Sequence, residues 1–500
     1  MTPTIQVPVP NRTQPFWLQE RHALTDHVAA QEVPTEADIV IVGSGISGAT
    51  CAHYLYKELQ KRGSSSRQLK VVLLEADALC EGATARNGGH CKPLAFLGFR
   101  ADAKRHGTKA ANDALVFEAS HLARYTSIVQ EESLDCDLYA TRAFDIFFDA
   151  EDAEQGRLDY EARKELFPQA MQDADIRAVY DREELCRLSG VKGGLWGAHY
   201  PAGHLWPYKF CTQLIEKQIQ RGLQLYTHTP VQSIESPSSG VHLVHTPRGT
   251  IQAKSIIITT NGYTAHLLPE LAEKIIPVRG TVCSITPAPS HQLGSSPGPF
   301  RYTYGMRKRA GESDYLIPRQ GRGLSGVGDQ SIILGGAKGV FLAKTEEWYN
   351  NVREDQLISG TREYFEKFMS HRFDGWSQGH QSIDRIWTGI LGYSTDLLPF
   401  IGALPTRPEG IFLSAGFTGH GMPRIPGCSA AIVKLALAHF EGRQLASAQA
   451  AFEEVLPAPY LLTQKRLDEK ENLILGYMGH QGGQEAEMTP AEEGTARAHL

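Results

Sequence analysis

One glycine-rich turn near the start of the chain constrains its fold more than any other feature. Residues 38–42 read Asp-Ile-Val-Ile-Val, and four β-branched residues in a row predict a strand buried on both faces, as in a parallel sheet. The spacing G-x-G-x-x-G follows, which suits a tight turn, a close approach to a pyrophosphate and a closely packed helix over residues 49–62. We expect the turn to bind a dinucleotide through its six residues, Gly43, Ser44, Gly45, Ile46, Ser47 and Gly48.

A second apolar run, residues 69–75, follows the predicted helix and ends in an acid. A carboxylate at the end of this strand can accept hydrogen bonds from ribose hydroxyls, and we assign this role to Glu75. The acid comes later than usual because residues 63–67 lengthen the turn between helix and strand. The alternative, a βαβ unit that binds no ligand, does not explain why strand, glycines, helix and acid occur together.

Composition restricts the class of protein. A chain of 500 residues exceeds one ordinary core, so we expect at least two domains. The net charge of −6 predicts no nucleic-acid partner, and no apolar run is long enough to span a bilayer. The first thirty residues lack the apolar core of a secretory signal, and eight cysteines are scattered without a C-x-x-C pair. We therefore expect an intracellular protein with reduced thiols and no metal site.

The remaining pattern predicts two interleaved domains and two terminal segments. The nucleotide-binding domain is expected where buried apolar strands recur, in residues 36–100, 201–275 and 386–450. A second domain, inserted into the first, is expected in residues 101–200 and 276–385. Residues 1–35 form an extension that Phe16 and Trp17 anchor to the folded body. Residues 451–500 form a C-terminal segment that we expect to be disordered beyond about residue 465, because its composition is rich in Gln, Glu, Gly and Ala.

Several short motifs, taken together, resemble one family of flavoenzymes. They are residues 43–48, residues 75–76, GATARNGG at 82–89, TNG at 260–262, residues 395–402, and GFTGHGM at 416–422. Their order over residues 35–450 resembles the D-amino-acid oxidase (DAO) superfamily, which includes glycine, sarcosine and γ-glutamylputrescine oxidases. The resemblance implies bound FAD and an α/β fold, α+β overall, in which a Rossmann-like FAD-binding domain carries an inserted antiparallel-sheet substrate domain.

The resemblance also implies which residues contact FAD. Besides the glycine turn and Glu75, these are Ala76, Thr84, Arg86, Asn87, Gly88, Gly89, Val231, Asn261, Gly262, Gly419, His420, Gly421 and Met422. Residues 419–422 begin the last helix, whose positive end would stabilise the anionic reduced flavin. Some relatives tether the flavin through a cysteine, but residues 391–395 contain none, so we expect noncovalent FAD. Cys91 and Cys428 are the thiols near enough to contradict this expectation.

The family oxidises a carbon–nitrogen bond of an amine or amino acid by hydride transfer to flavin N5. The imine then hydrolyses, and O2 usually reoxidises the flavin to give hydrogen peroxide. Catalysis is mainly the positioning of the substrate over the flavin. The catalytic candidates near the flavin are His90, Arg279, His420 and Lys338, with Tyr302, Tyr304 and Tyr315 behind them.

Each catalytic candidate has a structural alternative. His90 contacts flavin or substrate, or is a packed histidine, and His420 contacts flavin or makes a structural hydrogen bond. Arg279 could pair with a substrate carboxylate, although we favour an arginine at the domain interface. Lys338 is a candidate for oxygen activation because sarcosine-oxidase-like relatives place a lysine on a nearby strand.

Two other functions share part of this pattern. A NAD(P)-dependent dehydrogenase would use the first glycine turn but has no use for the segments RNGG and GHG. A flavin-binding scaffold or trafficking protein without turnover would keep the whole fold. The last three residues, Ala498, His499 and Leu500, are a permissive variant of the Ser-Lys-Leu peroxisomal address, so we expect a cytoplasmic or peroxisomal location.

Overall fold

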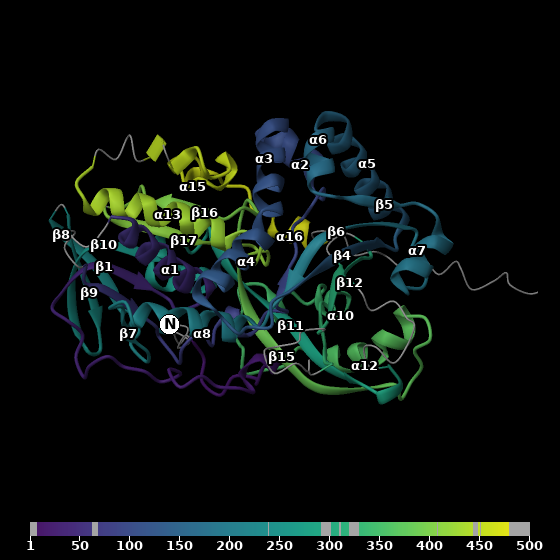
Figure 1. Cartoon of the computed structure of the whole chain (residues 1–500), viewed down its shortest axis with the longest axis horizontal. Coiled ribbons are helices and arrows are strands. Elements are labelled where there is room, and N and C mark those ends of the chain that lie inside the picture. Colours follow the sequence, from purple (N-terminus) through teal and green to yellow (C-terminus); the bar gives the residue numbers. More distant parts are fainter. Residues whose placement is uncertain are drawn as a thin grey trace, which may run out of the picture.

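Two β-sheets, each with helices packed around it, lie side by side along the long axis of the molecule (Figure 1). The computed structural model describes residues 8–62, 69–238, 240–291, 302–309, 312–319, 330–407, 409–443, 449–450 and 452–479. The residues 498–500 named above lie outside this part of the chain. The predicted fold class, α/β and α+β overall, is confirmed.

The first sheet contains the predicted nucleotide-binding strands. Among the described residues it holds eight strands, in the order β16 (Phe400–Ala403), β17 (Ile411–Ala415), β10 (Gly249–Ile258), β1 (Glu36–Val42), β2 (Val71–Leu74) and β7 (Gln224–Tyr226), with β9 (Val241–Thr246) beside β10 and β8 (Ser233–Ser238) beside β9. Strand β1 pairs in parallel with β2 and β10, with Val40 opposite Val72 and Ile256. Residues 39–41 are completely buried, as the unbroken apolar run predicts.

Long helices pack against this sheet and against one another. They are α1 (Ile46–Lys61), α4 (His121–Glu132), α8 (Pro207–Ile219) and α13 (Ile425–Phe440), of which α1 contacts both α8 and α13 (Figure 1). Helix α8 begins at Pro207 and α13 has Pro426 in its first turn, where proline needs no intrahelical hydrogen-bond partner. Helix α1 begins three residues before its predicted start. The last helix, α13, begins at Ile425, so the prediction that residues 419–422 begin it is wrong, because Gly419 adopts φ +67° and keeps this stretch in a turn ahead of the helix.

The second sheet is mainly antiparallel. Among the described residues it holds nine strands, in the order β15 (Gln381–Ser394), β11 (Ile275–Pro287), β14 (Ile332–Gly335), β13 (Ser313–Pro318), β12 (Tyr302–Arg307), β4 (Tyr139–Phe147), β6 (Trp196–His204) and β3 (His90–Cys91), with β5 (Arg177–Val179) beside β6. Of these pairs, β4 with β12 is parallel. Residues 90–91 and 386–394, which the sequence placed with the nucleotide-binding domain, lie in this sheet, because β15 stays paired with β11 as far as Ser394.

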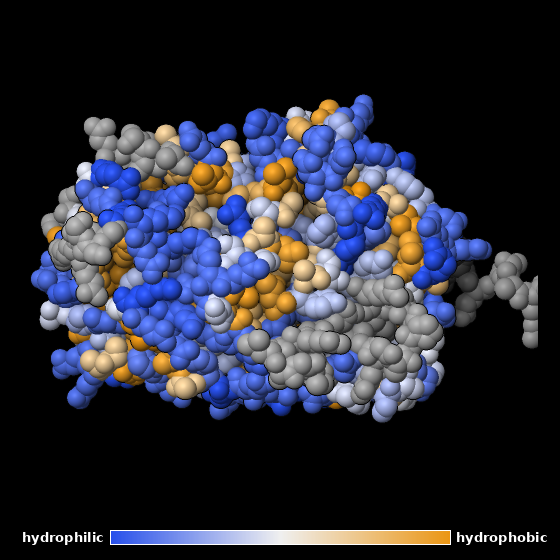
Figure 2. All heavy atoms as spheres, viewed as in Figure 1, coloured by the Kyte–Doolittle hydropathy of each residue, from blue (hydrophilic) through white to orange (hydrophobic). Residues whose placement is uncertain are grey.

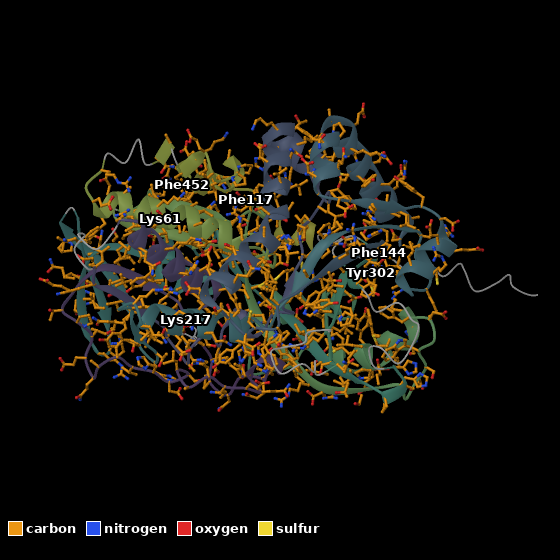
Figure 3. The ribbon with its side chains drawn as sticks, viewed as in Figure 1. Lys61, Phe117, Phe144, Lys217, Tyr302 and Phe452 are labelled. Atoms are coloured by element: carbon orange, nitrogen blue, oxygen red, sulfur yellow. The ribbon has the colours of Figure 1, made fainter. Side chains whose placement is uncertain are left out.

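Further helices pack around the second sheet and belong to the chain segments that connect its strands. They are α2 (Phe99–His106), α3 (Thr108–Ala119), α5 (Ala150–Leu166), α6 (Pro168–Asp173), α7 (Arg182–Ser189), α10 (Lys338–Phe341), α11 (Thr345–Trp348) and α12 (Thr361–Arg372), while the short α9 (Thr264–Leu267) follows β10. On the sheet itself Phe144 and Tyr302 lie side by side, with ring centroids 5.4 Å apart (Figure 3).

The N-terminal extension is anchored as predicted. Phe16 and Trp17 belong to the short 3-10 helix η1 (Phe16–Leu18) and are buried in the core between the sheets. The indole of Trp206 donates a hydrogen bond to the Trp17 carbonyl oxygen at 2.8 Å. Further along, the backbone N–H of Ala29 donates to Leu225 of the edge strand β7. The extension therefore runs along the edge of the first sheet, and Phe16 and Trp17 anchor it in the core.

The predicted disorder beyond about residue 465 is wrong for residues 465–479. This segment forms α15 (Gln464–Asp468) and α16 (Ile474–Tyr477), because Leu467, Ile474 and Met478 are buried apolar side chains. The surface in Figure 2 is mainly hydrophilic, with apolar atoms gathered towards the middle of the face shown. Within the described ranges no helix has both the length and the apolar character needed to cross a bilayer.

Candidate active site

The glycine turn has the geometry that its spacing predicts. Gly43 adopts φ +101°, a conformation that side chains other than glycine rarely take. A Cβ on Gly48 would collide with the Gly43 carbonyl oxygen, so α1 can approach β1 this closely only through a glycine. Gly45 caps α1 without a side chain, and Thr84 Oγ1 accepts a hydrogen bond from the Ile46 N–H at 2.8 Å.

Glu75 lies at the end of β2 beside this turn. Its Oε2 accepts hydrogen bonds from the N–H of Ser44 at 2.9 Å and from the Ser44 hydroxyl at 2.6 Å. Its Oε1 accepts from the N–H of Asp77 at 3.1 Å. Burial raises the pKa of Glu75 above its ordinary value, and the hydrogen bonds from Ser44 oppose that change. The carboxylate is therefore oriented by the turn that precedes α1.

A first cavity of about 790 Å³ lies against the turn and Glu75. Most residues predicted to contact FAD line it, namely Gly43, Gly45, Ile46, Ser47, Glu75, Ala76, Thr84, Arg86, Asn87, Val231, Asn261, Gly262, Gly419, Gly421 and Met422. Ser44, Gly48 and Gly89 are not among the residues that line it. Ser44 and Gly48 instead shape the turn, and a Cβ on Gly89 would collide with the Leu205 carbonyl oxygen.

A second cavity of about 910 Å³ adjoins the first. Both are lined by Ala83, Arg86, Asn87, Ile390, Leu391, Gly419 and Met422, so these residues mark where the cavities meet. All four catalytic candidates line the second cavity, together with Gly88 and Tyr315. Its walls come from the second sheet, from α2 and α5, and from residues 471–473 and 476–478 around α16. The C-terminal segment, which the sequence predicted to be disordered, thus forms part of this wall.

Tyr315 explains one of the paired glycines. Its ring lies between β3 and β14, where a Cβ on Gly88 or on Gly335 would collide with it. The ring centroids of Tyr315 and His90 are 6.3 Å apart. Gly88 is therefore required by a neighbouring aromatic side chain, a reason that the sequence did not reveal.

His420 is held by a buried carboxylate. Its Nε2 lies 2.9 Å from Oε2 of Glu118, and because a carboxylate only accepts hydrogen bonds, Nε2 carries the proton. Glu118 also accepts from Arg424 Nε at 2.7 Å, from the Leu94 N–H at 2.8 Å and from the Tyr460 hydroxyl at 3.2 Å. Burial would raise the pKa of Glu118, but His420 and Arg424 keep it well below its ordinary value. The structural hydrogen bond is thus present, and His420 lines the cavity as well.

His90 lies on β3 with its ring towards β12. Its Nε2 is 2.7 Å from the Thr303 hydroxyl oxygen. Burial lowers the pKa of His90 well below its ordinary value, and the nearby charge of Lys92 adds to this effect. The imidazole is therefore neutral at neutral pH and offers a hydrogen bond rather than a positive charge.

Arg279 and Arg86 are engaged by the protein itself. The Arg279 guanidinium pairs with the Glu347 carboxylate and donates to the carbonyl oxygens of Glu347 at 2.7 Å and Arg353 at 3.0 Å. Both partners lie in residues 276–385, the same predicted domain as Arg279, so these contacts do not place it at the domain interface, and both alternatives for Arg279 stay predictions. Arg86 donates to the Thr388 carbonyl oxygen at 2.8 Å, which links the end of η2 (Ala83–Ala85) to β15. The Asn261 side-chain oxygen accepts from the N–H of Gly416 at 3.0 Å.

Two cations that the sequence did not single out, Lys92 and Arg307, line the second cavity together with Lys338. Asp145 pairs with Lys92, and Asp314 lines the cavity near Lys338. Lys92 Nζ lies 2.9 Å and Arg307 Nε 3.5 Å from the Asp145 carboxylate. Burial opposes ionisation of Asp145, yet the charges of Lys92 and Arg307 keep its pKa below the ordinary value. This part of the wall therefore brings three cations, Lys92, Arg307 and Lys338, beside two acids, Asp145 and Asp314, of which Asp314 is already paired with Lys308.

Lys338 is the least engaged of the three cations. Among the described residues, its ammonium reaches one hydrogen-bonding partner, the Met478 sulfur at 3.5 Å. Burial and the nearby charge of Arg307 lower the pKa of Lys338 to about 8. Lys338 can therefore gain or lose its charge near physiological pH.

The cysteines lie away from both cavities. All eight are described, all are free thiols, and none of them lines either cavity. Cys91 and Cys428 are completely buried, and burial raises the pKa of each thiol above its ordinary value.

The chain is similar to known proteins along most of its length. A family model described as FAD dependent oxidoreductase (DAO) matches residues 38–435. A probable oxidoreductase, OrdL, of Haemophilus influenzae is 24% identical over 262 residues, an alignment that covers 50% of this chain and 56% of that protein. Glycine oxidase of Bacillus subtilis is 22% identical over 404 residues, covering 80% of this chain and 92% of that protein. The crystal structure of glycine oxidase from Geobacillus kaustophilus has a TM-score of 0.64 at 19% identity, and the match covers 86% of this chain and 99% of that one.

Proposed function

Because the chain belongs to the DAO family of FAD-dependent oxidoreductases, we propose that it oxidises the carbon–nitrogen bond of a substrate that carries a carboxylate, an amino acid or an N-substituted amino acid. The carrying observation is the cationic wall of the second cavity, formed by Lys92, Arg307 and Lys338. Family membership favours FAD over a nicotinamide cofactor, and we place this FAD in the first cavity.

The residues of the first cavity fit a dinucleotide. The Ile46 N–H at the start of α1 is bonded to Thr84, but Gly45 and Ser47 line the cavity beside it, so their N–H groups can face a pyrophosphate. Glu75, at the end of the next strand, can accept hydrogen bonds from ribose hydroxyls. When bound, FAD would accept a hydride from the carbon that carries the substrate nitrogen. The absence of cysteines from both cavities supports noncovalent binding.

The second cavity supplies positioning. Arg307 and Lys338 can hold a substrate carboxylate by charge-assisted hydrogen bonds. Since both line the same cavity as Gly419 and Met422, a carboxylate held there would leave the rest of the substrate near the meeting point with the first cavity. His90, neutral through burial, can accept or donate a hydrogen bond without competing for the carboxylate. Catalysis would then depend on orientation rather than on a strong base.

We infer an intracellular enzyme, because the eight cysteines are free thiols. We propose O2 as the electron acceptor, with hydrogen peroxide as the second product. This part of the proposal rests on the family resemblance alone, and a peroxide assay compared with an artificial-acceptor assay tests it.

The test of the main proposal is anaerobic bleaching of the flavin absorbance. Purified protein is mixed with a panel of amino acids, including glycine and sarcosine, and with the matching amines that lack the carboxylate. We expect amino acids to bleach the flavin and the matching amines to do so much more slowly. Equal bleaching by the two series would overturn the carboxylate proposal, and a protein that binds no FAD would overturn the whole assignment.

A further inference from the structure

The N-terminal extension reaches the first cavity. Pro8, Val9, Pro10, Asn11, Arg12 and Gln14 all line that cavity. The family match begins only at residue 38, so these residues lie outside the matched region. The sequence predicts an anchoring role for this extension and no contact with a ligand.

Arg12 joins two parts of the protein that belong to different sheets. Its side chain is 7% exposed, and its guanidinium pairs with the carboxylate of Asp77, which follows β2 of the first sheet. The same guanidinium lies 3.7 Å from the carboxylate of Glu354. Glu354 is held against the second sheet, because its Oε1 accepts a hydrogen bond from the Ile390 N–H of β15 at 3.0 Å.

Thr13 strengthens the same connection. Its hydroxyl donates to the Glu354 carbonyl oxygen at 2.9 Å and accepts from the Thr388 N–H of β15 at 3.0 Å. It also accepts from the Arg86 guanidinium at 3.2 Å. Arg86 lines both cavities, so Thr13 contacts a residue at their meeting point.

Arg12 also offsets negative charge at the wall of the first cavity. Glu75, Asp77 and Glu81 line the first cavity, and their carboxylates would repel an anionic pyrophosphate. Arg12 pairs with Asp77 and lies 3.5 Å from the Glu81 carboxylate. Although burial opposes its charge, Asp77 and Glu354 raise the pKa of Arg12 above its ordinary value, so the guanidinium stays protonated.

We propose that Arg12 and Thr13 form an N-terminal clasp that belongs to the FAD-binding site and slows release of the cofactor. Arg12 neutralises acids that line the cavity and links the loop after β2 to Glu354. Thr13 links the clasp to Arg86 and β15. The inference rests on FAD occupying the first cavity and not on the identity of the substrate.

The experiment compares release of FAD from Arg12→Gln, Thr13→Val and Arg21→Gln with release from the wild type. Arg21 is the matched control, because it bonds Glu81 at 2.9 Å but has a side chain 48% exposed and does not line the cavity. Flavin fluorescence after dilution gives the release rate, and titration of apoprotein gives Kd. We expect R12Q to release FAD about tenfold faster or more, T13V several-fold faster, and R21Q at nearly the wild-type rate.

Wild-type release rates for both R12Q and T13V would overturn the clasp. The clasp would also be overturned if R21Q released FAD as fast as R12Q does, because loss of any cation beside Glu81 would then be enough to speed FAD release. If circular dichroism shows that R12Q does not fold, T13V decides, since it keeps every charge. A wild type that holds FAD tightly but is not bleached by any amino acid would overturn the proposed function and leave the clasp intact.

Discussion

His420 donates a hydrogen bond from Nε2 to Oε2 of Glu118 at 2.9 Å, although 302 residues separate the two in the chain. Glu118 lies on α3 and is 1% exposed, while His420 lies in the loop where the two cavities meet. Arg424, at the start of α13, bonds the other oxygen of the same carboxylate. Phe117, which precedes Glu118 and is labelled in Figure 3, packs against Gly427 of α13. One buried acid therefore fixes the loop that carries Gly419 and Gly421.

Replacement of Glu118 by Gln should destabilise the protein. The change leaves the buried Arg424 guanidinium without its counter-charge, and breaking a buried pair typically costs about 3–5 kcal/mol of unfolding free energy. Urea denaturation of the FAD-bound protein measures the loss. Glu131→Gln is the control, because Glu131 is 40% exposed and its contact with Lys57 should contribute about 0.5 kcal/mol or less. Equal stability of E118Q and E131Q would contradict the role of the buried acid.

Replacement of Arg307 by Met should weaken binding of substrates that carry a carboxylate. Charge-assisted hydrogen bonds contribute about 1.5–3 kcal/mol, so KM should rise by about 10- to 100-fold. Bleaching by the matching amine without a carboxylate should not change. Arg309→Met, which removes a side chain that is 74% exposed, serves as the control and should keep the wild-type KM. A proportional loss for acid and amine would show that Arg307 supports the fold rather than the substrate.

Binding of the carboxylate should weaken as the pH rises through about 8. Lys338 has its pKa lowered to about 8 by burial and by Arg307, so it is charged below this pH and neutral above it. KM should therefore increase above about pH 8 in the wild type, and Lys338→Arg should keep KM flat because arginine stays protonated. Steady-state kinetics from pH 6.5 to about 9.5 test this, with Lys344→Arg as an exposed control. A K338R profile that still rises near pH 8 would assign the titration to another group.

Substitution of Gly48 by Ala should prevent FAD binding. The new Cβ would collide with the Gly43 carbonyl oxygen, so α1 would have to move away from β1. Gly82→Ala is the matched control, because Gly82 lines the same cavity and a Cβ there has no neighbour within 4 Å. Flavin content after purification should fall strongly in G48A and remain near the wild-type value in G82A. Full flavin in a folded G48A protein would contradict the close packing of α1 on β1.

The parts of the site that sequence reasoning could predict are local in the chain. Gly43, Gly45 and Gly48 occur within six residues, and the strand that precedes them is buried on both faces, so spacing and composition were sufficient. Phe16 and Trp17 were predicted as an anchor because two large aromatic residues stand together in a polar extension. These features depend on neighbours in sequence, and the structure confirms the fold that they indicate.

The parts that could not be predicted depend on contacts between distant segments. Glu118 looks like an ordinary helix acid until His420 and Arg424 are placed beside it. Arg279 and Arg307 are both arginines on strands of one sheet, and no local pattern shows that Glu347 engages the first. The ordered segment around α16 was missed for a related reason, since its few apolar residues are buried only by the body of the protein.

The position of β1 in the first sheet determines when, during synthesis on the ribosome, this strand can acquire its neighbours in the sheet. Val40 of β1 pairs with Ile256 of β10, and Ile256 in turn pairs with Ile411 of β17. The glycine turn is made before its supporting strands, because β10 and β17 both follow it in the chain. Until then β1 is an apolar strand with one side unpaired, which is a surface that chaperones recognise and that promotes aggregation. FAD can accordingly bind at this site only after β17 has been made, and FAD supply at that stage should determine how much of the nascent chain reaches its native state.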